Sequence, residues 1–345
     1  MRPGAGWLFH AVVQIKQFDP SVDTAQLRAC FEMTEAGWPT DHPNLPAWPL
    51  ESFTGKWIHG FDECPQQAWL AGEADAPVGG YLLRLPEKEN EARARCILIV
   101  APAHRRRGIG TALLKHCAEQ ARRAGRSWLR SDVRDDSAGA GFAAAIGARG
   151  GIAEVSRVLD LDSALPERLA ILRSAAQPHA AGYTLMSWSG ATPDSHIDRV
   201  VRLHNAMSDA PRDEGVDPVI WDADRVRKAD QKGIESGLHS HSVVACHDAS
   251  GEFAALTEII LDRGTPEWGF QGITVVLPKY RGHRLGLLVK IEMLGLLVGK
   301  APEVRRIFTD NAGSNEHMIA INEQLGFQIK DVTRSWELDL AVFGQ

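Results

Sequence analysis

The sequence lacks several features that define common classes of protein. Its 345 residues carry a formal net charge of −6, so a general attraction to nucleic acid is not expected. The five cysteines are odd in number and widely scattered, and none has the C-x-x-C or Cys/His spacing typical of zinc ligands. We therefore expect neither a disulfide framework nor a bound metal.

Long hydrophobic runs are also missing. The most apolar segment, Leu285–Val298, is too short to span a bilayer and contains Lys290 and Glu292. Residues Met1–Ala11 lack the long apolar region and cleavage site of a secretory signal. We therefore expect a cytoplasmic protein without a membrane partner and, at this length, one with two domains.

One stretch, Val100–Leu114, has an unusual order of residue types and reads V-A-P-A-H-R-R-R-G-I-G-T-A-L-L. An apolar run, three arginines, two glycines and an amphipathic Ala/Leu segment predict a strand, a turn and a helix. No Gly-Lys-Ser/Thr follows and G-x-G-x-x-G is incomplete, so this is neither a P-loop nor a dinucleotide fingerprint. Free N–H groups at the helix start, two glycines and nearby arginines predict a diphosphate site.

The stretch recurs as Val276–Gly286, which reads V-L-P-K-Y-R-G-H-R-L-G. Arg281 follows Arg105 by 176 positions (281 − 105), and a late glycine recurs after 179 positions (326 − 147). This near-constant offset indicates an internal duplication. Strands and helices alternate in both copies, which predicts an α/β fold with a mixed sheet. We divide the chain into a first domain (1–162), a linker helix (163–181) and a second domain (182–345).

The segment Gly37–Pro65 is expected to be irregular. Four prolines stand among tryptophans here, and prolines at that density exclude a continuous helix or a central strand. Two interpretations are open. The segment is either an aromatic loop packed over the sheet, or a lid or wall of a substrate site.

With both copies in view, nearly the whole chain resembles a tandem GNAT protein. The resemblance is to the actinobacterial kind, which includes mycothiol synthase and acyltransferases of secondary metabolism. Both turns resemble the acyl-CoA pyrophosphate loop V-x-P-x-x-R-x-x-G-x-G, and T-D-N-A-G-S-N-E-H-M-I-A-I-N-E-Q-L-G-F (309–327) resembles the late strand–helix unit of that group. The resemblance implies two splayed mixed sheets, acetyl-CoA or another acyl-CoA as cofactor, a small-molecule amine as partner, a monomer or homodimer, and a role in antibiotic biosynthesis.

The resemblance also implies which residues contact acyl-CoA, from the splayed strand, the loop and the helix start of each copy and from two late asparagines. They are Leu98, Ile99, Val100, Arg105, Arg106, Arg107, Gly108, Ile109, Gly110, Thr111, Thr274, Val275, Val276, Arg281, Gly282, His283, Arg284, Leu285, Gly286, Asn311 and Asn315. Asn311 and Asn315 either contact CoA or the acceptor, or cap the helix that begins there.

The two loops are expected to bind CoA differently. The first copy has both glycines, which predicts tight binding. In the second copy Arg284 stands in the first glycine place and blocks close backbone approach, unless it folds outward and grips a phosphate. We therefore predict weaker or differently arranged binding in the second copy.

Candidate catalytic groups occur in the second copy. Glu258 lies in the apolar strand Ala255–Ile260, where GNAT enzymes commonly place a general base, and burial there raises a carboxyl pKa. The other interpretation is a glutamate on the solvent face of an edge strand. Asn322 stands where the family often has a tyrosine as thiolate acid, but an asparagine donates a hydrogen bond without supplying a proton. A water or His317 is then the alternative acid, and for His317 a surface histidine is the other interpretation.

In the first copy the matching strand, Val78–Leu85, has no carboxylate, and Ala143 falls in the tyrosine place. We therefore expect a cofactor-holding first domain and an N-acyltransferase in the second. Two rival functions remain. One is a non-catalytic acyl-CoA-binding protein, since the tyrosine is missing from both copies. The other is an aminoacyl-tRNA-dependent peptide-bond-forming enzyme, which needs a basic channel that the net charge argues against.

Overall fold

A computed structural model describes residues 14–60, 64–73 and 76–344; the other residues, including Met1–Ala11, lie outside this description. The elements of the first half are, in order, β1 (Ile15–Phe18), α1 (Thr24–Asp41), α2 (Leu50–His59), β2 (Gln66–Glu73), β3 (Ala76–Arg84), β4 (Arg93–Val100), α3 (Ile109–Arg123), β5 (Trp128–Arg134), α4 (Ala138–Ala145) and β6 (Arg149–Asp160). Those of the second half are α5 (Leu165–Ala176), β7 (Tyr183–Ser189), α6 (Ile197–Asn205), α7 (Ala223–Glu235), β8 (Leu238–His247), β9 (Phe253–Asp262), β10 (Trp268–Val276), α8 (Leu285–Lys300), β11 (Arg306–Ala312), α9 (Glu316–Leu325) and β12 (Gln328–Asp339).

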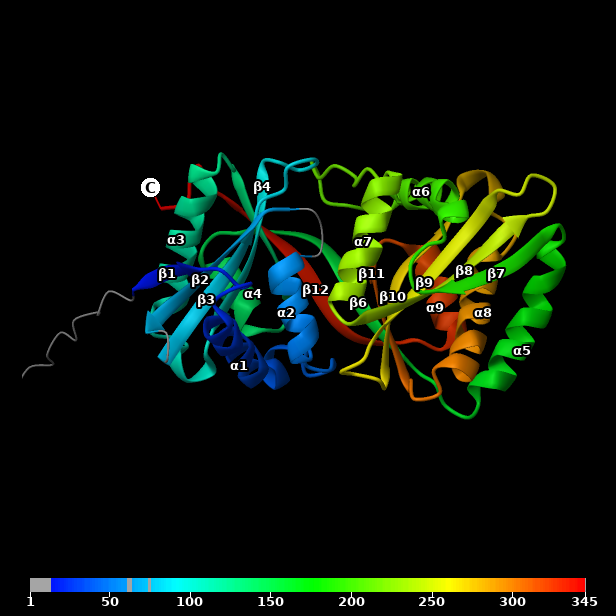
Figure 1. Cartoon of the computed structure of the whole chain (residues 1–345), viewed down its shortest axis with the longest axis horizontal. Helices are drawn as coiled ribbons and strands as arrows, with labels where there is room; N and C mark the ends of the chain where they lie inside the picture. The colour runs from blue at the N-terminus through cyan, green and yellow to red at the C-terminus, as the bar shows by residue number, and fades with distance from the viewer. Residues whose placement is uncertain (1–13, 61–63, 74–75, 345) are drawn as a thin grey trace, which may run out of the picture.

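The twelve strands form one mixed sheet that runs through both halves (Figure 1). The strand order is β1-β2-β3-β4-β5-β12-β6-β11-β10-β9-β8-β7. The last strand of the chain, β12, therefore lies between β5 and β6 of the first half, while β6 pairs antiparallel with β11 of the second. Because each half thus borrows a strand from the other, their relative placement is fixed by backbone hydrogen bonds.

In each half the sheet splays open at the strand that leads into the glycine-rich turn. The parallel pair β4–β5 is hydrogen-bonded only over 93–95 with 128–130. The equivalent pair β10–β11 is joined only over 268–270 with 306–308. Beyond these short ladders the strands separate, so the later backbone groups of β4 and β10 have no strand partner on that side. Each half is therefore splayed as the resemblance implied, but the two sheets that it implied are joined into one.

Alternating side chains of the strands pack against helices on opposite faces of the sheet. In the first half, Tyr81 and Leu83 of β3 pack with α3, whereas Leu82 between them packs with α1 and α2. This is the period of two expected of a strand buried on both faces. The predicted linker helix α5 contributes Leu165 and Leu169 to the core of the second half. The helix is therefore part of that half's packing.

The apolar segment after the second turn forms α8, and ten of its sixteen residues are buried. A helix apolar on nearly all sides is expected in the middle of a large core. Its low charge content thus reflects packing between α5 and the sheet. Within the described ranges, no helix has both the length and the apolar character needed to cross a lipid bilayer.

The prediction that Gly37–Pro65 is irregular throughout is wrong. Helix α1 continues to Asp41 with Pro39 in its last turn, and α2 begins directly after Pro49. Pro49 lies just before the helix, where a missing N–H group costs little. Trp57 of α2 is 2% exposed and packs in the core, so burial of aromatic side chains stabilises this short helix. The remaining prolines lie outside the two helices.

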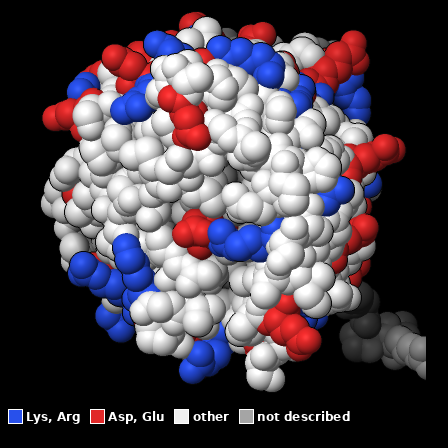
Figure 2. All heavy atoms as spheres, turned by 90° about the vertical axis from the view of Figure 1, so that its right-hand side faces the viewer, with Lys and Arg blue, Asp and Glu red and all other residues white. Residues whose placement is uncertain are grey.

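Figure 2 shows the end of the molecule formed by the second half. Charged side chains lie mostly along the margin of this face, and the broad central area contains few of them. The edge strand β7 and helix α5 are at this end of the molecule (Figure 1).

Candidate active site

The first glycine-rich turn has the geometry of an anion-binding loop. After β4 the chain makes a short 3₁₀ turn over Pro102–His104, and α3 then begins at Ile109. Gly108 caps the helix with φ 83°, in the left-handed region that glycine adopts without strain. The N–H groups of the first helical turn have no intrahelical acceptor and are free to bind an anion.

The side chains predicted to contact CoA in this turn divide into two groups. Arg106, Arg107 and Thr111 carry side chains that are at least partly accessible to a ligand. Ile109 is 7% exposed and packs in the core, so only its backbone amide remains available. The sequence pattern predicted the turn but did not distinguish these two kinds of contact.

The second turn keeps the same backbone without the glycine. Arg284 caps α8 with φ 55° and ψ 21°, the left-handed conformation that Gly108 has in the first turn. Its side chain folds outward, as predicted for one alternative, but it reaches the linker: Nη1 donates to the carbonyl of Ala175 at 3.4 Å. Nδ1 of His283 likewise donates to the carbonyl of His179 at 3.1 Å. Leu285 is buried, so its side chain cannot contact a ligand.

The leading arginine of each turn is held by an aspartate. In the first half, Arg105 makes a bidentate ion pair with Asp41, with distances of 3.0 and 2.6 Å. In the second half, Nη2 of Arg281 donates to Oδ2 of Asp209 at 2.9 Å. Each arginine also points its Nε at the carbonyl of the last residue of the preceding strand. A carboxylate is thus the present partner of each guanidinium, and an anionic ligand has to compete with it.

A cavity of about 720 Å³ opens at the splay of the second half. Three groups of predicted residues line it: the strand Thr274–Val276, the loop residues Arg281 and Gly286, and the asparagines Asn311 and Asn315. Gly282, His283, Arg284 and Leu285 do not belong to this lining. At Gly286 a Cβ would lie 3.3 Å from Ile321 and 3.4 Å from Val276, so a larger residue would crowd the entry to the helix.

The two predicted asparagines have different roles. Asn315 caps α9, because its Oδ1 accepts the backbone N–H of Met318 at 3.3 Å. The capping interpretation therefore fits this residue, which also lines the cavity. The side chain of Asn311 instead joins the hydrogen-bond network of Asn322. His317 is exposed and lies at the cavity wall.

Glu258 is not among the residues that line this cavity, but it lies opposite a β-bulge that is. Between β9 and β10 the register shifts so that Gly272 and Ile273 together face Glu258. A bulge of this kind re-aims side chains and interrupts pairing. Gly272 lines the cavity, and a Cβ placed on it would lie 3.7 Å from Oε2 of Glu258. Strand β9 pairs on both sides, so the interpretation of Glu258 as a residue of an edge strand is wrong.

The surroundings of Glu258 favour its protonated form. Burial, and next the negative charge of Asp230, raise its pKa to about 7, although a hydrogen bond from Ser242 works in the opposite direction. Oγ of Ser242 donates to Oε1 of Glu258 at 3.2 Å. A carboxyl group with a pKa near neutrality both accepts and releases protons at physiological pH.

Asn322 occupies a different environment from the one predicted. It is 0% exposed and lies behind the cavity lining, and its side chain is hydrogen-bonded to two lining residues. Its Oδ1 accepts a hydrogen bond from Nζ of Lys290 at 2.8 Å, and its Nδ2 donates to Oδ1 of Asn311 at 2.7 Å. Lys290 and Asn311 line the cavity and Asn322 links them from behind. The prediction of a catalytic Asn322 is corrected to a supporting position.

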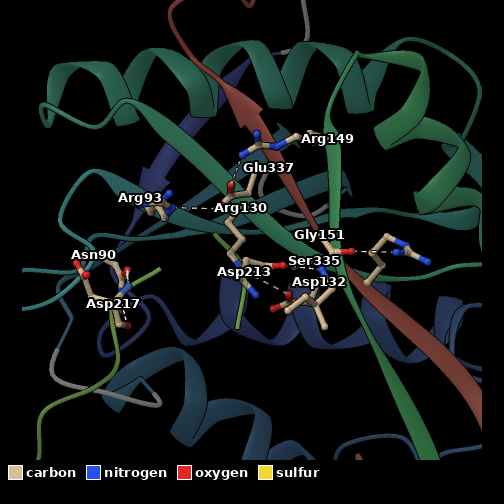
Figure 3. Close-up of polar contacts among 12 residues, drawn as sticks. Asn90, Arg93, Arg130, Asp132, Arg149, Gly151, Asp213, Asp217, Ser335 and Glu337 are labelled. Atoms are coloured by element: carbon tan, nitrogen blue, oxygen red, sulfur yellow. Dashed lines mark hydrogen bonds and ion pairs between the residues drawn. The ribbon is translucent and has the colours of Figure 1, made fainter. Parts of the chain in front are cut away.

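A polar cluster around Asp213 joins the loop after α6 to strands β5, β6 and β12 (Figure 3). Ala210 and Pro211 line the cavity, and Asp213 follows them in the same loop. Asp213 accepts hydrogen bonds from Oγ of Ser335 at 2.6 Å and from the N–H of Ile152 at 2.5 Å, and Nη1 of Arg130 lies 3.0 Å away. Burial alone would raise the pKa of Asp213, but these hydrogen bonds and Arg130 lower it overall.

Two further contacts tie the same loop to the segment between β3 and β4. The side chain of Asn90 both accepts from and donates to the backbone of Asp217, at 2.7 and 3.0 Å. Arg225 at the start of α7 pairs with Glu89 at 2.8 Å. Figure 3 shows Asn90 and Asp217 side by side at one end of the cluster. The first half therefore supports a wall of the second half's cavity, which the sequence did not indicate.

Among the described residues, no group of three or more His, Cys, Asp or Glu side chains is arranged to hold a metal ion. The side chains that line the cavity include the carboxyl groups of Asp209 and Asp310, the ammonium group of Lys290, the guanidinium of Arg281 and the imidazole of His317.

The splayed sheet, the turn into a helix with its left-handed cap, and the doubling of both define the class of GNAT acyltransferase folds. Residues 27–145 match the model of the acetyltransferase (GNAT) family. The whole chain is similar to a tandem GNAT protein from the clavulanic acid biosynthesis pathway, solved without acetyl-CoA. The two are 27% identical, with 95% of this chain and 98% of that chain covered and a TM-score of 0.79. Residues 27–145 thus match the GNAT family, and the chain as a whole has the fold of a tandem GNAT protein.

Other solved structures share the fold at lower identity. A GCN5-related N-acetyltransferase from Sphaerobacter thermophilus is 16% identical, with 96% of each chain covered and a TM-score of 0.63. A glucosamine N-acetyltransferase region of a fungal multi-domain β-N-acetylglucosaminidase is 15% identical over 95% of this chain and 38% of that chain, with a TM-score of 0.63. At these identities the likeness concerns the fold alone. A search of curated protein sequences finds no match.

Proposed function

We propose that this protein is an acyl-CoA-dependent N-acyltransferase that moves an acetyl or other acyl group to the amine of a small molecule. The second half catalyses the acyl transfer, and the first half binds acyl-CoA without catalysing the transfer. The observation that carries the proposal is the cavity of about 720 Å³, which joins an anion-binding helix start, a splayed strand and the bulge beside Glu258. The match of residues 27–145 to an acetyltransferase family supports it.

The nucleotide end of acyl-CoA is assigned to the turn before α8. The first-turn N–H groups and Arg281 offer donors for diphosphate oxygens, and Gly286 leaves room for them. Arg281 then exchanges Asp209 for the diphosphate. The pantetheine arm is assigned to the unpaired side of Thr274–Val276, where backbone groups without a strand partner offer hydrogen bonds.

The acyl end is assigned to the bulge. The amine attacks the thioester carbonyl, and Glu258 accepts the proton from the nitrogen, directly or through a water. A carboxylate beside the bulge serves this role because the bulge interrupts the ladder between Glu258 and the cavity. N–H groups of the bulged strand are available to stabilise the oxyanion.

We also propose the kind of metabolism and the cellular compartment in which the enzyme acts. The similarity to a protein of clavulanic acid biosynthesis supports a role in secondary metabolism. Acyl-CoA donors and the free thiols of the five cysteines are consistent with a cytoplasmic enzyme. The identity of the amine and the choice between monomer and homodimer stay predictions, as does the division into domains at 162 and 182.

The test combines binding and turnover. Native mass spectrometry of the full chain with acetyl-CoA should detect one or two bound molecules, and a panel of acyl-CoA donors against an amine library should release CoA thiol with at least one pair. A complete absence of both would overturn the proposal. Binding without thiol release from any pair would instead favour a non-catalytic acyl-CoA-binding protein, and strong salt-dependent binding of tRNA would favour a tRNA-dependent enzyme.

A further inference from the structure

Lys290 has an unusual position for a lysine. It lies on α8 one turn after Gly286, lines the cavity, and is only 2% exposed. Its Nζ donates to Oδ1 of Asn322 at 2.8 Å and lies 5.1 Å from the centre of the Phe327 ring. Within the described part of the chain, no carboxylate lies within ion-pair distance of this ammonium group. A buried ammonium group without a counter-charge is costly, so its presence calls for a reason.

The fold itself does not require a lysine there. With the offset of 176 positions, Lys290 corresponds to Leu114 on α3 (290 − 176), which is 5% exposed and packs in the core. With the offset of 179, its partner Asn322 corresponds to Ala143 (322 − 179), which is 7% exposed. The first half thus builds the same helix pair with apolar residues. The polar pair occurs only in the half that contains Glu258.

Lys290 shares the cavity with both ends of the proposed acyl-CoA site. Gly286 marks the diphosphate end and Gly272, beside Glu258, the acyl end, and both line the cavity together with Lys290. A GNAT reaction has to protonate a departing thiolate in this space, and both halves lack the tyrosine that commonly does so. Asn322, which stands in that place, holds the ammonium group of Lys290 instead.

We propose that Lys290 is the general acid that protonates the CoA thiolate, an inference that rests on the N-acyltransferase function proposed above. The amine nitrogen forms a bond to the thioester carbonyl carbon and gives one proton to Glu258. The intermediate collapses, the C–S bond breaks with its electron pair on sulfur, and sulfur takes one proton from the Lys290 ammonium. The products are an amide and CoA thiol, and solvent returns the proton held by Glu258 to Lys290.

The proton of Lys290 is transferable near neutral pH. Burial lowers the pKa of this ammonium group to about 7 from its ordinary value of 10.5. A thiol has an ordinary pKa of about 8.5, so transfer from the ammonium group to the thiolate is favourable. The titratable or charged groups around Lys290 are Asp209, Arg281, Asp310 and His317 in the cavity, Glu258 behind the bulge of β10, and the pair of Glu292 with Arg173 of α5.

The test compares Lys290→Met with Lys290→Arg and a matched control, Lys300→Met, at the exposed end of the same helix. With acetyl-CoA and an accepted amine, Lys290→Met should lower kcat by about 10²- to 10³-fold and leave KM for acetyl-CoA within about threefold. The loss should shrink to below about tenfold with 4-nitrothiophenyl acetate, because that thiolate leaves without a proton. Lys300→Met should behave like the unchanged enzyme.

The pH profile gives a second readout that needs no folded Met variant. For the unchanged enzyme, kcat with acetyl-CoA should fall as pH rises above about 7, because Lys290 loses its proton. The fall should be absent with 4-nitrothiophenyl acetate and in Lys290→Arg, whose guanidinium keeps its proton. A Lys290→Met enzyme as active as the unchanged one would overturn the role of Lys290 but not the proposed function. An equal fall in kcat at alkaline pH with both donors would have the same meaning. An unchanged enzyme that transfers no acyl group would overturn the proposed function.

Discussion

The two halves of this protein have the same backbone geometry around the glycine-rich turn and differ in a few side chains. Each half has a strand that splays from its parallel neighbour, a turn with a left-handed helix cap, and an arginine held by an aspartate. These shared features depend on backbone geometry, which survives substitution at most positions. The left-handed cap is kept even though Arg284 stands where the first half has a glycine.

The side chains around the splay are where the halves diverge. At the position of Glu258 the first half has Leu82 (258 − 176), which is 1% exposed in an apolar core. The ladder between β9 and β10 is bulged at this point, whereas the ladder between β3 and β4 runs without a register shift. This difference fits the proposal that both halves hold a cofactor and that proton transfer uses Glu258 and the β9–β10 bulge of the second half.

The largest effect is expected from removing the candidate base. Glu258→Gln keeps the shape of the side chain and its contact with Ser242 but cannot accept the proton of the amine. We expect kcat to fall by about 10²- to 10⁴-fold. Isothermal titration with CoA should give an unchanged affinity, because Glu258 lies at the acyl end. The exposed Glu303→Gln serves as a control, and a near-normal kcat in the Glu258→Gln variant would remove Glu258 from the mechanism.

The next effect concerns the support that the first half gives to the second. Asp213→Ala removes three polar contacts and leaves Arg130 with Asp132 at 3.6 Å as its remaining acidic partner. We expect the free energy of unfolding to fall by about 2 to 3 kcal/mol in urea titrations and KM for the amine to rise, while CoA affinity stays constant. Unchanged stability and unchanged KM together would mean that this cluster does not position the cavity wall.

The lowered pKa of Asp213 determines how the stability lost in Asp213→Ala depends on pH. A carboxyl group with a lower pKa in the folded state binds its proton less readily than in the unfolded chain. Its stabilising contribution is therefore present at neutral pH and is lost as pH falls through its folded pKa. The difference in stability between the unchanged protein and Asp213→Ala should accordingly narrow in acid. A gap that widens in acid would contradict this account.

Removing the leading arginine of either turn should have a smaller effect, and it should show which turn binds the acyl-CoA used in turnover. Arg105→Gln and Arg281→Gln each remove one guanidinium from a diphosphate site and should weaken CoA binding to that half by about ten- to a hundredfold. Native mass spectrometry should then show loss of the CoA that the altered loop binds, and the double variant should bind none. Only Arg281→Gln should raise KM for acyl-CoA in turnover. If Arg105→Gln raised it equally, the first half would take part in the reaction.

Local sequence patterns predicted the parts of the site whose cause is local. The spacing of proline, arginine and glycine fixes each turn, and the acid within an apolar strand drew attention to Glu258. Lys290 stood in an apolar helical run, where its only visible meaning was a charge that argues against a membrane span. Its role depends on Asn322, which lies 32 positions away and on another helix.

Contacts between distant segments were beyond the reach of those patterns. Asp213 lies in a polar loop without periodicity, and its partners Ile152 and Ser335 are 61 and 122 positions away. The insertion of β12 between β5 and β6 was equally hidden, since a strand's own sequence does not name its neighbours. Pro39 led to the opposite error, because the expected break in the chain does not occur and α1 continues through Pro39 to Asp41.

The smallest effect tests the shared backbone directly. Arg284 holds a left-handed conformation that costs a non-glycine residue about 1 kcal/mol. Its outward contact with Ala175 is long, at 3.4 Å. Arg284→Gly should therefore raise the free energy of unfolding by about 0.5 to 1 kcal/mol, even though glycine gives the unfolded chain more freedom. CoA affinity of the second half should stay the same or improve, because the side chain does not line the cavity.

The reverse change, Gly108→Arg, gives the matched comparison in the first half. It should destabilise the first turn by a similar amount in the same urea titration, because an arginine there has to adopt the left-handed conformation that glycine adopts freely. A clear loss of CoA affinity in Arg284→Gly would instead show that this guanidinium leaves the linker to bind the ligand, and the two loops would then differ in how they bind CoA.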